Sequence, residues 1–286
     1  MQLSPRVNNR GSLHIRDRAL RWGERTYLMG IVNVTPDSFS GDGIEETDLA
    51  AAYGVVQLER GSDILDIGAE STRPGHQPVS AKIEQDRLLP VIAEIRRRLP
   101  SAFLSADTYK PDVLRAAQRA GADILNSVWG LPDELLAVAA ELEMPVVAMH
   151  NKTEATYAGS VMDDVLRFLE NAGQRAVAAG IPPEHVMLDP GIGFGKTADQ
   201  NIEVLRWLDR LPALGFPTVL GTSRKSTIGK LTGREPGDRA YGTAATTALA
   251  VAAGIDIVRV HDVSEARDVV RVADAIVRDW RPDGWI

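Results

Sequence analysis

The chain has no cysteine, which excludes disulfide bonds, thiolate metal sites and cysteine nucleophiles. It also has no apolar run long enough to span a membrane. Positive charge is not in excess: the net charge is −7, which argues against a general binder of nucleic acids or anionic membranes. A small anionic substrate, held by a few local cations, is still compatible with this balance.

The N-terminal region lacks the continuous apolar segment of a signal peptide, so the sequence predicts a cytoplasmic protein. Apolar residues make up 44% of the 286 residues and charged residues 25%, which is enough for one substantial core. We expect residues 1–12 to be disordered. Residues 13–286 contain no linker or low-complexity segment and are expected to form a single domain.

The chain does contain eight short apolar runs, each followed by a helical pattern. The runs are rich in Val, Ile and Leu and show little alternation, which is typical of parallel strands buried on both faces. They span residues 27–34, 64–69, 102–107, 124–128, 146–150, 186–189, 218–222 and 257–261. Eight such units predict an α/β fold, a (β/α)8 TIM barrel, with an open doubly wound sheet as the alternative.

Ahead of the first run, LHIRDRALRWGERTYLM alternates apolar and polar residues around Trp22 and Gly23. This alternation predicts an N-terminal β-hairpin that leads into the first strand. Three segments that follow predicted strands are long and rich in glycine or proline, at residues 35–47, 71–80 and 224–239. Long loops over a rigid barrel are candidate lids.

Each apolar run ends in polar residues that can do chemistry. In a barrel the C-terminal strand ends and the loops after them form the active site, so these residues are expected to meet in one pocket. The strand ends carry Asn33, Asp66 with Glu70, Asp107, Asn126, His150, Asp189, Ser223 with Lys225, and Arg259 with His261.

Several of these ends favour a functional role over a structural one. Asn33 places an amide at the end of a buried strand, which a turn alone would not explain. Arg259 and His261 are two residues apart and share one strand face. An arginine inside a barrel is costly unless it is paired, so an anionic partner is expected. Lys225 has Arg224 and Ser226 beside it, which favours anion and polar contacts over Schiff-base chemistry.

Other positions leave two interpretations open. Asp107 and Asp189 could act as acid or base, bind a ring edge with several N–H donors, or cap the helices that follow. At Asp189 the next residues, Pro and Gly, delay the helix and favour a site role. Arg73 could clamp a phosphate or lie in solvent. His150, beside Met149, is as often structural as a ligand.

DPGIGFGKT, at residues 189–197, does not have the glycine spacing of a P-loop or of a dinucleotide-binding fingerprint. It predicts a loop whose backbone closes on a ligand, with Phe194 as a possible wall. No His and carboxylate spacing resembles a zinc site. Any divalent ion would therefore be Mg²⁺-like, held by a few protein oxygens and by phosphates of the ligand.

Five motifs together resemble the dihydropteroate synthase family, the pterin-binding barrels of folate biosynthesis. They are MGIVNVTPDSFS (29–40), DIGAESTRPG (66–75), DPGIGFGKT (189–197), GTSRKS (221–226) and RVHD (259–262). The motifs stand in the family's order and at the expected strand ends, and the resemblance runs from about residue 25 to the last helix.

The resemblance implies a transferase that joins 4-aminobenzoate to 6-hydroxymethyl-7,8-dihydropterin diphosphate with Mg²⁺, releasing 7,8-dihydropteroate and pyrophosphate. The diphosphate would leave first, and the arylamine would then attack a pterin-stabilised cation. It also implies small-molecule substrates, no nucleic-acid or membrane partner, and a homodimer built through outer helices. Sulfonamides mimic 4-aminobenzoate in this family.

The family pattern also assigns roles to residues at the matching positions. Asp107, Asn126, Asp189 and Lys225 would hold the pterin; Asn33, Arg259 and His261 would hold the diphosphate, with Asn33 as a ligand of its metal; and Thr72, Arg73, Phe194 and Ser226 would shape the 4-aminobenzoate site. Gly193, Ser223 and Met149 would add substrate contacts. The residues expected to be catalytic are Lys225, Asp189, Arg259 and Asp107.

The chain departs from the family pattern at Ser127, where many members have Asp, and at Ala69, where Gly is common. Three other functions compete with the synthase. A methyltetrahydrofolate-dependent methyltransferase domain would not need the STRPG motif or the anion-binding set. A catalytically silent pterin-binding protein would have lost that set, which is intact here. A Schiff-base aldolase would use Lys225 and would be trapped by borohydride.

Overall fold

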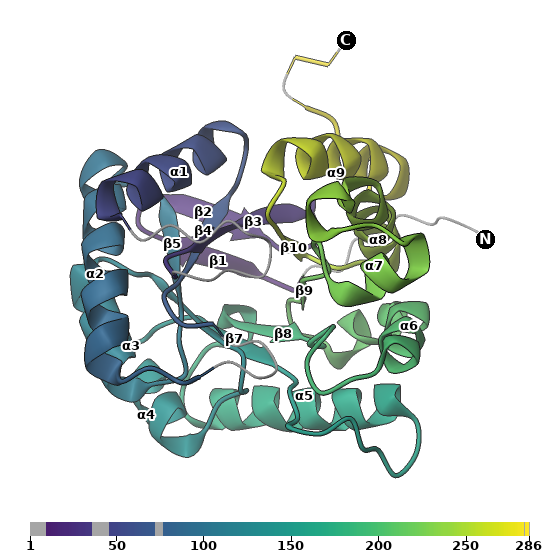
Figure 1. Cartoon of the computed structure of the whole chain (residues 1–286), viewed down its shortest axis with the longest axis horizontal. Coiled ribbons are helices and arrows are strands. Elements are labelled where there is room, and N and C mark those ends of the chain that lie inside the picture. The colour runs from purple at the N-terminus through teal and green to yellow at the C-terminus, as the bar shows by residue number, and fades with distance from the viewer. Residues whose placement is uncertain (1–9, 36–45, 72–76, 283, 286) are drawn as a thin grey trace.

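The computed structural model describes residues 10–35, 46–71, 77–282 and 284–285, and these residues form a (β/α)8 barrel with an N-terminal hairpin (Figure 1). The barrel strands are β3 (Tyr27–Asn33), β4 (Ile64–Gly68), β5 (Phe103–Asp107), β6 (Ile124–Ser127), β7 (Val146–Met149), β8 (Val186–Asp189), β9 (Val219–Leu220) and β10 (Ile257–Val260). The predicted fold class is therefore confirmed.

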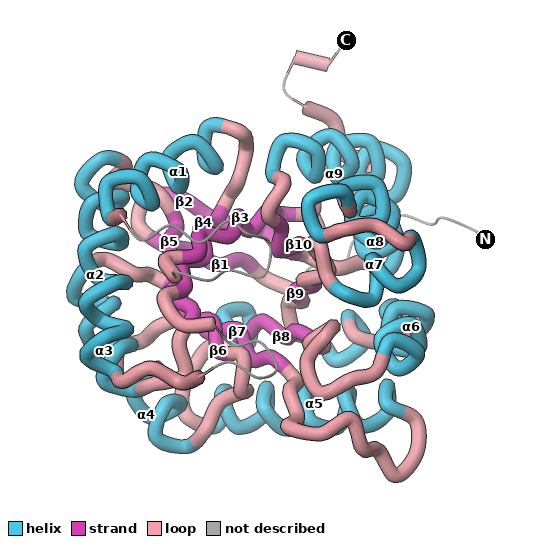
Figure 2. Tube along the Cα trace, in the orientation of Figure 1, coloured by secondary structure: helices cyan, strands magenta, loops and turns pink. Residues whose placement is uncertain are grey.

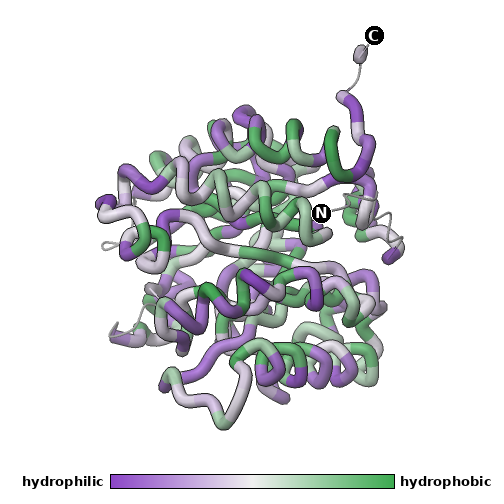
Figure 3. Tube along the Cα trace, turned by 90° about the vertical axis from the view of Figure 1, so that its right-hand side faces the viewer, coloured by the Kyte–Doolittle hydropathy of each residue, from purple (hydrophilic) through white to green (hydrophobic). Residues whose placement is uncertain are grey.

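Helices cover the outside of the ring of strands (Figure 2). They are α1 (Thr47–Glu59), α2 (Ala81–Arg98), α3 (Pro111–Ala120), α4 (Asp133–Glu141), α5 (Val161–Ala178), α6 (Ala198–Arg206), α7 (Ser226–Thr232), α8 (Ala240–Ala253) and α9 (Val263–Val277). Apolar and polar segments alternate along these helices (Figure 3). This alternation is expected of helices with one face on the barrel and the other toward solvent.

All neighbouring strands in the ring pair in parallel, in the order β8-β7-β6-β5-β4-β3-β10-β9. An isolated parallel bridge between Leu188 and Thr218 connects the two ends of this order. The β9 strand is shorter than the predicted run of residues 218–222. Pro217, just before it, has no N–H to donate to the ladder, although its carbonyl oxygen accepts a bond from Leu188 N at 2.9 Å.

The inside of the barrel changes character from one end to the other. Near the N-terminal strand ends the inward side chains form one buried apolar cluster: Tyr27, Met29, Ile64, Phe103, Ile124, Val147, Met187, Val219 and Ile257. Residues two apart on a strand share a face. The next inward positions on the same strands therefore include Asp66, Ser105, Asn126, Asp189 and Arg259. We call this apolar cluster the barrel floor; the polar inward residues lie above it, toward the C-terminal strand ends.

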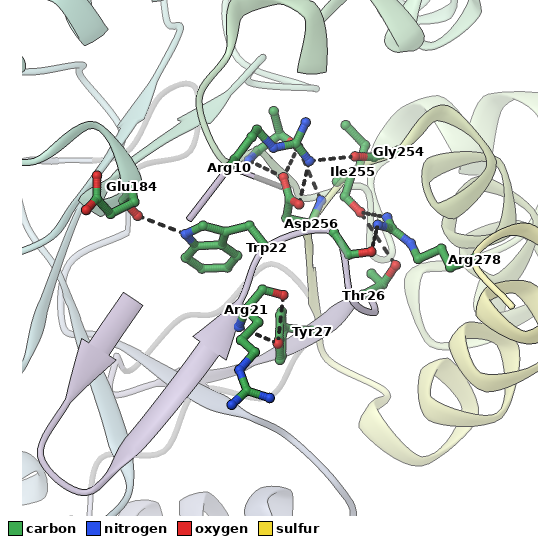
Figure 4. Close-up of polar contacts among 12 residues, drawn as sticks. Arg10, Arg21, Trp22, Thr26, Tyr27, Glu184, Gly254, Ile255, Asp256 and Arg278 are labelled. Atoms are coloured by element: carbon green, nitrogen blue, oxygen red, sulfur yellow. Dashed lines mark hydrogen bonds and ion pairs between the residues drawn. The ribbon is translucent and has the colours of Figure 1, made fainter. Parts of the chain in front are cut away.

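A hairpin of β1 (Ser12–Ile15) and β2 (Arg18–Arg21) covers this floor. Leu13, Leu20 and Trp22 belong to the same buried cluster as the floor residues. Trp22 Nε1 donates to the Glu184 carbonyl oxygen at 2.9 Å, and its ring meets the Tyr27 ring edge-on at 5.8 Å (Figure 4). The apolar face of the hairpin is thus what closes the barrel at this end.

The turn of the hairpin is not where the alternation placed it. Ile15 pairs with Arg18, so the two strands reverse at Arg16 and Asp17, and Arg16 takes a positive φ of 57°. Trp22 and Gly23 instead form the following turn into β3. The predicted hairpin is confirmed, but its turn lies elsewhere, because alternation marks extended segments without marking the reversal inside them, and no glycine or proline lies at residues 16–17.

Of the segment predicted to be disordered, only residues 10–12 lie within the described part of the chain. Arg10 Nη2 lies 2.5 Å from Asp256 Oδ1 and 3.3 Å from the Gly254 carbonyl oxygen, and Ser12 begins β1 (Figure 4). Nearby, Arg278 Nη2 donates to the Ile255 carbonyl oxygen at 2.7 Å. The Arg10 contacts fasten the start of the hairpin to the loop between α8 and β10, and the Arg278 contact joins the end of α9 to the same loop.

Of the three candidate lids, residues 35–47 lie mainly outside the described residues, and half of residues 71–80 do so. The third, residues 224–239, is not a long loop, because α7 occupies Ser226–Thr232. Ile228 is buried there, and Gly233 ends the helix in the left-handed conformation. Among the described residues, no helix combines the length and apolar character needed to cross a membrane.

Candidate functional site

A cavity of about 500 Å³ opens at the C-terminal ends of the barrel strands. Its wall contains nearly all the residues that the sequence predicted for the site. These are Asn33, Asp107, Asn126, Met149, Asp189, Gly193, Phe194, Ser223, Lys225, Ser226, Arg259 and His261. The remaining two, Thr72 and Arg73, lie outside the described residues. Residues from across the whole chain therefore meet in one pocket, at the place the barrel rule predicts.

Asp66 organises the deep part of this pocket; the sequence placed it among the strand-end residues but assigned it no role. Its side chain is fully buried on β4. Oδ1 accepts from Ser105 Oγ at 2.6 Å, and Oδ2 accepts from Asn126 Nδ2 at 3.0 Å and from Arg259 Nε at 2.6 Å. One carboxylate thus fixes an amide and a guanidinium on two other strands.

Arg259 connects this buried group to the pocket wall. Its Nη2 lies 3.0 Å from Asp107 Oδ2, so the guanidinium bridges the Asp66 and Asp107 carboxylates. These carboxylates supply the negative charge that a buried arginine needs. The carboxylates raise the pKa of Arg259 and desolvation opposes them, and the group stays a cation.

Asp107 presents an unused oxygen to the pocket. Its Oδ1 is buried and has no hydrogen-bond partner among the described residues. Burial raises the pKa of Asp107 to about 8; the Asp66 carboxylate adds to the rise and Arg259 opposes it. A carboxyl group with this pKa can bind a ligand as a proton donor or as an acceptor near neutral pH.

Asp189, at the end of β8, and Lys225, after β9, also line the pocket and attract each other electrostatically. Asp189 Oδ1 accepts from Gly191 N at 2.7 Å, which bends the chain just after β8, and burial raises the pKa of Asp189. Lys225 Nζ donates to the Ile192 carbonyl oxygen at 2.5 Å and lies 4.7 Å from the centre of the Phe194 ring. Desolvation lowers the pKa of Lys225 to about 8.

The rim of the pocket at β10 and β3 carries the groups suited to an anion. His261 Nδ1 lies 3.0 Å from Ser223 Oγ, and the same hydroxyl oxygen accepts from His261 N at 3.1 Å. Because β3 pairs with β10, Asn33 lies on the strand next to His261. The Asn33 side chain makes no hydrogen bond to another described residue and lines the cavity.

Beside the mouth, Glu70 is held by a lysine that the sequence did not single out. Lys110 Nζ pairs with Glu70 and also lies 2.6 Å from Glu84 Oε2, while Tyr109 Oη donates to Glu70 Oε1 at 2.7 Å. Glu84 is buried on α2, and burial raises its pKa. Lys110 lies three residues past the end of β5, and this position after a strand end is the sequence feature that could have identified it.

The two departures from the family pattern lie away from the pocket wall. Ser127 follows Asn126 on β6, so the two side chains point to opposite faces of the sheet. Ser127 is fully buried and its hydroxyl has no hydrogen-bond partner among the described residues. Ala69 is fully buried as well, and neither residue lines the cavity.

The barrel and its pocket, with carboxylates and cations in one wall, define a pterin-binding enzyme: residues 29–261 match the family model described as "Pterin binding enzyme". The chain is 42% identical to the dihydropteroate synthase of Bacillus subtilis (strain 168), over 93% of each chain. This protein belongs to the dihydropteroate synthase family.

Solved structures agree with this assignment. A Yersinia pestis dihydropteroate synthase in complex with a sulfonamide drug has a TM-score of 0.88 and 37% identity, covering 93% of this chain and 98% of that one. A dihydropteroate synthase of Xanthomonas albilineans in complex with 7,8-dihydropteroate has a TM-score of 0.81 and 41% identity, covering 91% and 95%.

Proposed function

We propose that this protein condenses 4-aminobenzoate with 6-hydroxymethyl-7,8-dihydropterin diphosphate to give 7,8-dihydropteroate and pyrophosphate. The observation that carries the proposal is that one pocket combines the carboxylates Asp107 and Asp189 with Arg259, His261 and Asn33 on the β10 and β3 side. The substrate is a ring rich in N–H groups joined to an anion. The pocket has the complementary arrangement.

The pterin ring fits the deep half. Asp189, Asp107 and Asn126 offer acceptors and an amide to an amino-pyrimidine edge, and Asp107 has an oxygen free for this purpose. Lys225 carries a positive charge below about pH 8 and could donate to a ring nitrogen or carbonyl. Met149 in the wall supplies apolar contact with a ring face.

The reaction breaks the bond between the pterin methylene carbon and the diphosphate oxygen, and the electron pair leaves with that oxygen. The arylamine nitrogen then bonds to the methylene carbon and releases a proton to solvent. Arg259 and His261 are placed to stabilise the negative charge that develops on the leaving diphosphate. Phe194 and Ser226, with Thr72 and Arg73, are assigned to the 4-aminobenzoate side.

Mg²⁺ is proposed as the cofactor, with Asn33 as its protein ligand. Mg²⁺ keeps several waters and is bound through few protein oxygens together with substrate phosphates. The Asn33 amide lines the cavity beside the anion-binding rim and fits that chemistry, and the described residues contain no cluster of three or more acidic or histidine ligands that would suit a closed metal site. When bound, the ion would neutralise charge on the diphosphate.

The deciding experiment is a product assay. The purified protein is incubated with Mg²⁺, the dihydropterin diphosphate and 4-aminobenzoate, and dihydropteroate is detected by mass. We expect product in the presence of Mg²⁺ and none after chelation. No product, with the pterin diphosphate still bound, would identify a silent binding protein; no product and no pterin binding would reject the assignment.

The lowered pKa of Lys225 favours one second candidate, a Schiff-base aldolase, because a neutral amine is a nucleophile. The Lys225 ammonium, however, donates to the Ile192 carbonyl oxygen and lies over the Phe194 ring. Borohydride treatment with a carbonyl substrate is expected to leave the mass of the protein unchanged. A stable adduct on Lys225 would instead support the aldolase.

A cytoplasmic homodimer is also proposed. Exposed apolar side chains lie on the outer helices α7, α8 and α9: Leu231, Tyr241, Leu249, Val272 and Ile276. These three helices lie side by side in Figure 1. A two-fold contact would bury such a surface in both subunits. Light scattering after size-exclusion chromatography should give twice the mass of one chain, which is 31.0 kDa.

A further inference from the structure

Lys196 lies behind the loop that forms one wall of the pocket, and it is not itself part of the wall. Its side chain is only 9% exposed. The ammonium lies 2.8 Å from His150 Nδ1 and donates to the carbonyl oxygens of Gly191 at 2.9 Å and Phe194 at 3.1 Å. Burying a lysine without a carboxylate in contact is costly, so the burial of Lys196 among these three acceptors needs an explanation.

His150 is arranged to accept from this lysine. Its imidazole is fully buried, and Nε2 faces Asp164 Oδ2 at 3.4 Å. The carboxylate favours the tautomer with the proton on Nε2, which leaves the Nδ1 lone pair for the Lys196 ammonium. Burial, with the Lys196 charge adding to it, lowers the pKa of His150 to about 4, so the ring is a neutral acceptor at ordinary pH.

The wall loop, residues 191–195, is held from both sides through its carbonyl oxygens. Behind the loop, Lys196 donates to the carbonyl oxygens of Gly191 and Phe194, and Tyr157 Oη donates to the Gly195 carbonyl oxygen at 2.8 Å. On the pocket side, Lys225 donates to the Ile192 carbonyl oxygen. Gly193 N donates to Asn201 Oδ1 at 2.8 Å. Side chains from several elements thus fix a short glycine-rich loop.

We propose that Lys196, oriented by His150, is a positioning residue that fixes the wall loop so that the Phe194 ring and the Ile192 carbonyl oxygen meet Lys225. The inference rests on the proposed function for its substrate: the wall it shapes faces the 4-aminobenzoate side. Lys196 touches no substrate. It acts on the reaction by setting where Phe194 lies, at the outer edge of the pterin site.

The consequence is a selective kinetic defect. A loop displaced by about 1 Å can cost two orders of magnitude in rate. With Lys196→Met, which keeps the length of the side chain and removes its donors, we expect KM for 4-aminobenzoate to rise by about ten- to a hundredfold. KM for the pterin diphosphate should change less, because Asp107 and Asn126 lie on β5 and β6, away from the loop, and only Asp189 of the three is bonded to it, through Gly191 N.

The test combines steady-state kinetics with hydrogen exchange of the full-length protein, followed by mass spectrometry. In Lys196→Met, exchange in residues 190–197 should accelerate while β4 to β7 keep their protection. Lys82→Met is the matched control, because Lys82 is 78% exposed and pairs with Asp86 on the outer helix α2. It should behave like the wild type in both measurements.

A second pair of variants keeps the test decisive if Lys196→Met does not fold. His150→Asn retains an acceptor oxygen for the ammonium, and His150→Leu removes it. Loop exchange and KM for 4-aminobenzoate should be near wild type in His150→Asn and strongly altered in His150→Leu. Equal behaviour of this pair, or wild-type loop exchange in Lys196→Met, would overturn the proposal. Failure of the wild type to make product would reject the proposed function, and hydrogen exchange would still test the loop.

Discussion

Arg259 on β10 and Asp66 on β4 form an ion pair across the inside of the barrel, with Nε and Oδ2 2.6 Å apart. The strand β3 stands between them in the sheet, so the pair does not follow from neighbouring strands. Asp66 also accepts from Ser105 and Asn126, which makes its carboxylate the common partner of three polar side chains. The geometry of the deep pocket depends on this one group.

Asp66→Ala should therefore destabilise the protein strongly. Removing one partner of a buried ion pair leaves the other charge uncompensated, which typically costs about 3–5 kcal/mol. Urea denaturation would measure the loss in free energy of unfolding. Glu94→Ala is the control, since Glu94 pairs with Arg97 and Arg98 at the surface, and little change is expected there. Equal losses in the two variants would contradict this account.

Lys225 should set the alkaline limit of activity. Its pKa is lowered to about 8, so it loses its proton as the pH rises through that value, and turnover should fall in the same range. Lys225→Met should reduce turnover about 10²–10³-fold, the usual effect of removing one electrostatic contact to a reacting group. A pH–rate profile measures the limb. Lys230→Met, at an exposed position of α7, should leave it unchanged, and a wild-type profile flat to pH 10 would reject the assignment.

The loop after β8 should tolerate no side chain at Gly191. A Cβ there would lie 1.9 Å from the His150 carbonyl oxygen, and φ is +68°. Gly233 also has φ +68° but has nothing within 4 Å, so Gly233→Ala isolates the backbone strain, about 1–2 kcal/mol. Gly191→Ala should cost clearly more and should impair turnover. Indistinguishable unfolding curves for the two variants would show that the loop adapts.

The metal prediction concerns Asn33. Chelation should stop turnover, and added Mg²⁺ should restore it. Asn33→Ala should raise the Mg²⁺ concentration that gives half-maximal rate, while Asn33→Asp should lower it, because a carboxylate binds Mg²⁺ better than an amide. Ser226→Ala serves as the control, with an effect on 4-aminobenzoate and none on Mg²⁺. A Mg²⁺ requirement identical in all three variants would remove Asn33 from the metal site.

The sequence predicted the fold well because parallel strands buried on both faces leave a direct signal in their apolar runs. It located the pocket for a related reason: a barrel brings its strand ends together whatever the loops do, so Asn33, Asp189 and His261 could be grouped without coordinates. The position of the hairpin turn and the helix α7 were missed, because both depend on local reversal and capping, which an apolar pattern does not encode.

The contacts between side chains were beyond the sequence. Asp66 and Arg259 are 193 residues apart, and only the closed ring of strands shows that they touch. The role of Lys196 could not be predicted for another reason. Its glycine-rich motif predicts a loop that closes on a ligand, whereas its ammonium points away from the pocket to His150. Pattern reasoning identified which side chains could reach the site, and the barrel determined which of them bind ligand and which hold the others.

The hairpin that covers the barrel floor has a consequence for the order of events. Trp22 and the apolar cluster above it close one end of the barrel, and the described residues of the pocket wall lie at the other end. Substrates and products then enter and leave the pocket at the same end. A ligand in the deep half must bind first and leave last, so a ligand in the outer half delays the exchange of the deep ligand.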